Sequence, residues 1–229
     1  MQRVFAPPAA PGQPASSASP DPAELLARYH PLVVTERRGR ALQDLLRRTN
    51  LTVWYEARCA RPVRRVLVAL DPSTSSRVLG RILDVGTLLA DVTGAELFAV
   101  HAWDAPGERL IRFHCSRESA EEYVHSQSAE ARTLLEQRLE LAHTRIDQAH
   151  RSCSRGDACS VITRAVGELQ IDALVLGMSR RTPLARALLG CTAVRLAEAV
   201  SCHVIIIPSA EAMTGRGSLP RAVAIRRAA

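Results

Sequence analysis

Two glycines near the C-terminal end of the chain have the spacing of a phosphate-binding loop. Gly177 ends an apolar run, and Gly190 stands just before a helical pattern that starts at Thr192. Glycines let backbone N–H groups approach phosphate oxygens, and the N-terminus of the following helix adds positive potential. The pattern therefore predicts a nucleotide-binding loop between a strand and a helix.

Two side chains in this loop, those of Arg180 and Cys191, could change its affinity for a nucleotide or its reactivity. If Arg180 must adopt a positive φ, the backbone strain is about 1–2 kcal/mol, and its side chain could fill the groove. Conversely, its guanidinium could bind a phosphate with two hydrogen bonds. We expect weakened binding. Cys191, at the start of the helix, could be a redox-reactive thiol, although an inert thiol is the more common outcome.

Asp71 and His101 are the other polar candidates, each at or near the end of a predicted strand. Asp71 could contact a ligand, or it could cap the turn DPSTSS; both alternatives stay open. His101 is interpreted as a packed strand residue, because no carboxylate or nucleophile is evidently placed beside it.

Strands must alternate with helices to bring these residues together. The predicted elements are, in order, a strand at 66–71, a helix ending at Gly94, a strand at 96–103, a loop of uncertain form, a helix at about 120–149, a short strand in HRSCSRGD, a helix at 160–169, a strand at 171–177, a helix at 192–200 and a strand at 203–208. This order predicts a five-stranded parallel sheet covered on both faces, with the ligand crevice at the carboxyl ends of the strands.

Composition narrows the possible functions. All 30 basic residues are arginine, which removes any lysine of the P-loop kind, and the six cysteines form no CxxC pair, so we expect reduced thiols and no metal site. No apolar run reaches the roughly 20 residues that span a bilayer, and no secretory signal is evident, so we expect a cytoplasmic protein. The net charge of +7 fits a polyanion partner or simply an arginine-rich genome composition.

The composition of both ends of the chain predicts that they are not ordered. Residues 1–22 are rich in Pro, Ala, Ser and Gly and are predicted to be a disordered leader, and 209–229 a flexible basic tail.

The stretch from about 64 to 208 resembles the universal stress protein family. The family signature is G, two residues, G, nine residues, G and then Ser or Thr, between the fourth strand and the fourth helix. Gly177 and Gly190 match its first and last glycines, Arg180 replaces the middle one, and Cys191 takes the hydroxyl position with Thr192 next to it. The resemblance implies an adenine nucleotide α-hydrolase-like fold and a site for ATP or another adenine nucleotide.

The resemblance also places the rest of the pocket. It implies that Asp71 meets the adenine side, that Ala69 and Ala102 line the wall against the base, and that Leu176 stands just before the signature. The segment from Gly156 to Ala158 matches the family's glycine turn before the third helix. The implied adenine half is intact, whereas the triphosphate half is altered at Arg180 and Cys191.

Residues 21–57 repeat the order helix, strand, helix, strand of residues 160–208. This resembles tandem universal stress proteins, with 23–57 as a truncated remnant of a first domain; an unrelated N-terminal segment is the alternative. Residues 51–55 could pair with 203–207, either within one chain or between two chains of a homodimer, which would cover an exposed strand edge. A longer gene product with a misassigned start is a further alternative.

We therefore expect a non-enzymatic stress-response or regulatory protein with a weakened adenine-nucleotide site. No residue set makes a convincing catalytic apparatus. One alternative is a nucleotide-hydrolysing enzyme in which Asp71 helps position a metal, which would require a full phosphate loop and further acidic ligands. Another is an RNA or polyanion-binding module that uses Arg180, Arg181 and Arg186.

Overall fold

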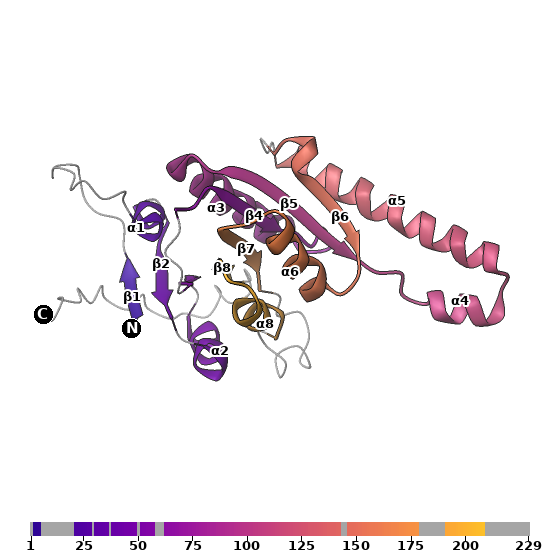
Figure 1. Ribbon diagram of the computed structural model, residues 1–229, viewed down its shortest axis with the longest axis horizontal. Helices are drawn as coiled ribbons and strands as arrows, with labels where there is room; N and C mark the ends of the chain where they lie inside the picture. Colours follow the sequence, from indigo (N-terminus) through magenta and orange to yellow (C-terminus); the bar gives the residue numbers. More distant parts are fainter. Residues whose placement is uncertain are drawn as a thin grey trace, which may run out of the picture.

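A single eight-stranded sheet organises the molecule, in the order β1-β2-β3-β8-β7-β4-β5-β6 (Figure 1). The computed structural model describes residues 2–5, 21–28, 30–36, 38–49, 51–57, 62–142, 146–178 and 191–208. Five adjacent strands are mutually parallel, as predicted: β4 (Arg65–Ala69), β5 (Glu96–Trp103), β6 (Arg151–Arg155), β7 (Ala173–Gly177) and β8 (His203–Ile207). The α/β class predicted from the alternation of elements is confirmed.

Helices cover both faces of the parallel strands because side chains alternate across each strand. Val66 and Val68 of β4 join one apolar cluster with α3 (Ser76–Thr93) and α5 (Arg117–Leu141). Leu67, between them, joins a second cluster with α6 (Ala158–Glu168) and α8 (Cys191–Ala199). The two faces are called here the α3/α5 face and the α6/α8 face.

The region between β5 and β6 differs most from the sequence prediction. The predicted loop contains a short helix, α4 (Glu108–His114), and α5 begins at Arg117 because the Ser116 hydroxyl accepts the Ser119 N–H at 3.2 Å. The predicted end near residue 149 is wrong: α5 stops at Leu141, and η1 (Gln148–His150) leads into β6. The prediction extended the helix too far because Ile146 continues the spacing of apolar residues. Ile146 is buried, although it lies outside the helix.

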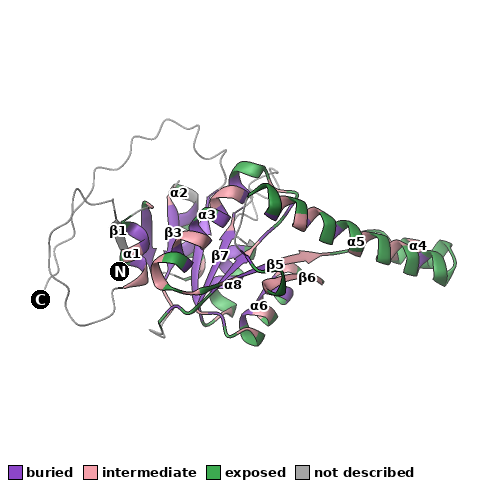
Figure 2. Cartoon of the chain, turned by 90° about the horizontal axis from the view of Figure 1, so that it is seen from above, coloured by how far each residue is buried: buried purple, intermediate pink, exposed green. Residues whose placement is uncertain are grey.

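The helical hairpin of α4 and the first half of α5 projects beyond the end of the sheet (Figures 1 and 2). Leu110 and Phe113 on α4 are exposed, and Figure 2 shows this part of the molecule mostly in the colour of exposed residues. Tyr123 ties the hairpin together by donating its hydroxyl to the Pro106 carbonyl at 2.6 Å.

The N-terminal segment extends the sheet past β8. It contributes β1 (Gln2–Phe5), α1 (Pro22–Ala27), β2 (Leu32–Thr35), α2 (Gly39–Arg48) and β3 (Thr52–Tyr55). Strand β2 runs parallel to β3, and β3 runs antiparallel to β8 with Trp54 opposite Ile205. Of the two pairings considered from the sequence, the structure contains the one within a single chain.

The predicted disordered leader is wrong at residues 2–5, which form β1 and pair antiparallel with β2. The outer edge of β2 offers unpaired backbone groups, and four residues with extended backbone satisfy them. Residues 6–20 and the predicted tail at 209–229 lie outside the described residues.

The proposed repeat agrees with the structure in part and stays a prediction. The order helix, strand, helix, strand is present in 21–57, and α2 packs on the same face as its predicted counterpart α8. Helix α1 does not: Ala23 and Leu26 pack on the α3/α5 face, whereas its predicted counterpart α6 lies on the opposite face. If the two copies of the repeat were related by a two-fold axis normal to the sheet, α1 and α6 would lie on the same face.

Candidate functional site

The carboxyl ends of β4, β5 and β7 bring three predicted wall residues together. Ala69 lies opposite Val100 of β5 on one side and opposite Leu176 of β7 on the other. Ala69, Ala102 and Leu176 all belong to the apolar cluster of the α6/α8 face. Two of the three are alanines and are partly exposed, so this edge presents small apolar side chains, called here the small-residue wall.

Asp71 sits at the rim of this wall, in the turn that follows β4. Its Oδ1 accepts the Ser73 backbone N–H at 2.9 Å and the Ser73 hydroxyl at 2.6 Å. The turn-capping role considered from the sequence is therefore real, since this is an Asx turn. Among the described residues none donates to Oδ2, so a ligand contact through that oxygen is compatible with the same geometry.

His101 holds the backbone next to Asp71, a positioning role that the sequence did not reveal. Its Nδ1 lies 3.0 Å from the Leu70 carbonyl, which can only accept, so Nδ1 carries the hydrogen. Burial lowers the pKa of His101, and the Leu70 bond and the charge of Asp71 oppose that shift in part. Leu70 in turn donates its N–H to Val100 at 2.9 Å. This neutral histidine thus fixes the turn and fits the packed-residue interpretation.

Gly177 has a packing reason that is independent of any ligand. A Cβ at this position would lie 2.8 Å from Ile82 Cδ1 and 3.5 Å from Val78 Cγ1, both on α3. The contact is on the α3/α5 face, opposite the small-residue wall. Because the nearest atom is the far end of the Ile82 side chain, this packing favours a small residue at 177 without requiring glycine. The role of Gly177 toward a phosphate stays a prediction.

The rest of the signature is only partly described. Arg180 and Gly190 lie outside the described residues, as does the side chain of Cys191, the first residue of α8. Thr192 is exposed in the first turn of α8. The predicted contacts of these residues with a phosphate are accordingly not tested by the structure.

The glycine turn before α6 lies at the same edge of the sheet. Gly156 has φ +141°, a conformation that favours glycine, and donates its N–H to the Trp103 carbonyl at 2.9 Å. Asp157 then caps α6 by accepting the Ser160 N–H at 3.1 Å. The turn joins β6 to α6, and its hydrogen bond to Trp103 links the carboxyl ends of β5 and β6.

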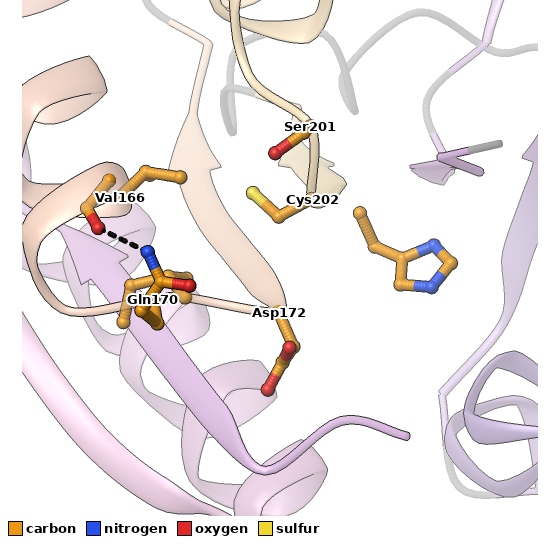
Figure 3. Close-up of a pocket in the computed structure, with 8 residues that line it drawn as sticks. Val166, Gln170, Asp172, Ser201 and Cys202 are labelled. Carbon is orange, nitrogen blue, oxygen red and sulfur yellow. Dashed lines mark hydrogen bonds between the residues drawn. The ribbon is translucent and has the colours of Figure 1, made fainter. Parts of the chain in front are cut away.

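A concavity lies at the opposite, amino edge of the strands. It is a cavity of about 130 Å³ between the end of α6 and the beginnings of β7 and β8, lined among others by Gln170, Asp172, Ser201 and Cys202 (Figure 3). The Asp172 Oδ2 already accepts the backbone N–H groups of Arg64 and Arg65 at 2.9 and 3.1 Å. Burial raises the pKa of Cys202 to about 12, so its thiol stays protonated. These groups do not form an activated nucleophile.

Other kinds of site find no support within the described parts of the chain. No group of three or more His, Cys, Asp and Glu side chains there is arranged to hold a metal ion. In those same residues, no helix combines the length and apolar character that a membrane crossing requires. The described cysteines Cys115, Cys153, Cys159 and Cys202 are all in the thiol form.

Comparisons with known proteins agree with the fold. The model of the Universal stress protein family matches residues 62–208. No curated protein matches the chain.

Solved structures have a similar fold at low sequence identity. A functionally unknown protein from Pseudomonas aeruginosa PAO1 is 19% identical with a TM-score of 0.56, over 76% of this chain and 57% of its own. A universal stress protein from Archaeoglobus fulgidus DSM 4304 is 18% identical with a TM-score of 0.50, over 72% of this chain and 52% of its own.

A third structure, a universal stress protein in complex with cAMP, is 19% identical with a TM-score of 0.43, over 65% of this chain and 98% of its own. At these identities the likeness to the first two structures shows the fold alone. The chain spans little more than half the length of the first two structures.

Proposed function

Because the chain belongs to the universal stress protein family, we propose that it is a non-enzymatic stress-response or regulatory protein that binds an adenine nucleotide. The nucleotide would lie at the carboxyl edge of β4, β5 and β7, on the α6/α8 face. This is the edge at which ligands bind in open parallel α/β sheets.

The observation that carries the proposal is the shared face of Ala69, Ala102 and Leu176. Their small or apolar side chains offer a flat surface against which a purine ring can pack. Asp71 at the rim supplies a carboxylate that can accept hydrogen bonds from the adenine amine or from ribose hydroxyls. His101 keeps the backbone beside this carboxylate in place.

The phosphate half should contribute less than the adenine half. Arg180 replaces the middle glycine, and Cys191 replaces the hydroxyl residue of the family signature. The arginine side chain would hinder the close approach of backbone N–H groups to phosphate oxygens, and the hydroxyl donor is lost. We therefore expect ATP and AMP to bind with affinities within about threefold of each other, a difference below 1 kcal/mol.

Calorimetry of the full chain with ATP, with AMP and with buffer alone tests this function. Asp71→Ala should weaken the binding of both nucleotides by about tenfold, the effect of losing one hydrogen-bonded charged contact. Asp71→Asn keeps an Oδ1 acceptor for the turn and should fall between Asp71→Ala and the native protein. Asp91→Asn, an exposed carboxylate near the end of α3, is the matched control and should bind like the native protein.

Two outcomes would decide against parts of the proposal. Asp71→Ala with native affinity would remove Asp71 from the site. For the phosphate half, Arg180→Gly should strengthen ATP binding and leave AMP binding nearly unchanged. If Arg180→Gly instead weakens ATP binding, the arginine binds the phosphates and does not fill the groove.

The alternative functions, the homodimer and the location of the protein remain to be considered. No observation favours nucleotide hydrolysis or polyanion binding over simple nucleotide binding. A homodimer through the last strand would need β3 to leave β8, so the pairing within the chain is the one we propose. A cytoplasmic location stays an expectation from the sequence.

A further inference from the structure

Two histidines, one buried and one half-buried, lie where the N-terminal segment 21–57 meets the rest of the molecule. His203 of β8 is 8% exposed, and its Nδ1 accepts the backbone N–H of Ala57, just past β3, at 3.3 Å. Its ring centroid is 5.2 Å from that of Trp54 on β3, at an interplanar angle of 48°. Because Nδ1 accepts this bond, the single ring proton of the neutral form lies on Nε2.

The second histidine, His30, follows α1 and reaches the other end of β3. Its Nε2 lies 2.7 Å from the Thr52 hydroxyl oxygen, and the Thr52 side chain is fully buried. The charges of Arg81 and Asp84 on α3 both act on the His30 ring, so His30 lies near α3 as well as near β3.

Burial favours the neutral forms of both histidine rings. Burial is the largest influence on the pKa of His203 and lowers it, while the carboxylates of Asp21 and Asp172 oppose that shift. Burial also lowers the pKa of His30, Arg81 adds to the effect, and Asp84 opposes it. Both histidines are therefore uncharged at neutral pH.

We propose that the segment 21–57 is an acid-releasable cover on the edge of β8. A proton on His203 Nδ1 would turn the acceptor of the Ala57 N–H into a second donor facing it, beside the buried Trp54 ring. A proton on His30 would place a cation next to Arg81. Both changes weaken contacts of the cover and leave the pairing of β4, β5 and β7 untouched.

The sign of the pH effect follows from proton linkage. Since both folded-state pKa values lie below the ordinary value of 6.5, the released segment binds protons more readily than the docked one. The docking free energy is therefore fully present above about pH 6.5 and declines as the pH falls toward the folded-state values. Release uncovers an apolar strand edge that can pair with another strand.

Hydrogen exchange of the full chain, corrected for the intrinsic pH dependence of amide exchange, tests the proposal at pH 7.5 and pH 5.0. Amides of β3 should lose protection by about tenfold at pH 5.0 relative to amides of β4. The variant His30→Gln/His203→Asn keeps acceptors near the positions of Nε2 and Nδ1 without a titrating ring. It should keep the protection of β3 within about twofold between the two pH values.

Controls separate this effect from general acid sensitivity. His125→Gln removes an exposed histidine on α5 and should behave like the native chain. In a Trp103→Phe background, Trp54 is the one remaining tryptophan, and its fluorescence should be quenched as His203 becomes protonated. This titration decides the question even if the double variant does not fold.

The proposal is overturned if the native chain keeps the protection of β3 at pH 5.0, or if the double variant loses as much as the native chain. Trp54 fluorescence that stays constant from pH 7.5 to pH 5.0 would also contradict it.

Discussion

Asp71 and His101 together set the geometry of the candidate site at the scale of single residues. One oxygen of Asp71 builds the turn after β4, and His101 holds the preceding carbonyl from the neighbouring strand. The sequence suggested the turn-capping role of Asp71, because DPSTSS is a good turn sequence, and the family resemblance suggested its ligand contact. It could not reveal the bond between His101 and Leu70, because that bond depends on the register of β4 against β5.

Cysteine reactivity is a prediction at this scale. Cys202 is buried and the pKa of its thiol is raised to about 12, whereas Cys115 is exposed at the end of α4. At pH 8, a maleimide should therefore modify Cys115 and leave Cys202 unmodified in the folded protein, as read by peptide mass spectrometry. In urea both should react. Labelling of Cys202 at the rate of Cys115 without denaturant would show that the start of β8 is not buried as described.

At the scale of elements, the bounds of strands and helices were predicted correctly where buried residues recur at a regular spacing. Strand β5 has the predicted bounds at both ends, because its apolar run is bounded by the Gly94 turn and by Asp104. Helix α4 was missed because it buries no residue, so no apolar period marks it. The end of α5 was placed too late because Ile146 is buried for reasons other than helical packing.

The close approach of α3 to β4 gives a testable prediction about one glycine. A Cβ on Gly86 would overlap Val68 Cγ1, and Val68 is fully buried with a stiff β-branched side chain. Gly86→Ala should therefore lower the free energy of unfolding by about 1–3 kcal/mol in urea denaturation.

Gly80→Ala is the matched control in the same helix. Nothing lies within 4 Å of a Cβ at Gly80, so the better helix propensity of alanine should raise the free energy of unfolding by up to about 1 kcal/mol. Equal stability of Gly86→Ala and the native protein would contradict the close packing of α3 on β4.

At the scale of the whole molecule, the main addition to the sequence reading is the way the N-terminal segment joins the sheet. The order of its elements was foreseeable from the alternation of apolar runs, and the pairing of β3 with β8 was expected from the family resemblance. The position of α1 on the α3/α5 face was not, because an apolar helix face fits either side of a sheet. The same limit applies to the site, since the sequence named the wall residues only through a family resemblance.

Two candidate places for a ligand therefore lie at opposite ends of the parallel strands. One is the small-residue wall at the carboxyl edge, and the other is the cavity beside Asp172 and Cys202 at the amino edge. Only the first has the chemistry proposed for a nucleotide. Locating the bound ligand at one edge or the other is thus a direct test of the account.

The decisive measurement is a nuclear magnetic resonance titration of the full chain with ATP. The account predicts saturable shifts of the amide and methyl signals of Ala69, Ala102 and Leu176, with little change at Gln170 or Cys202. Shifts concentrated at Gln170, Asp172 and Cys202, with Ala69 and Ala102 unmoved, would contradict it.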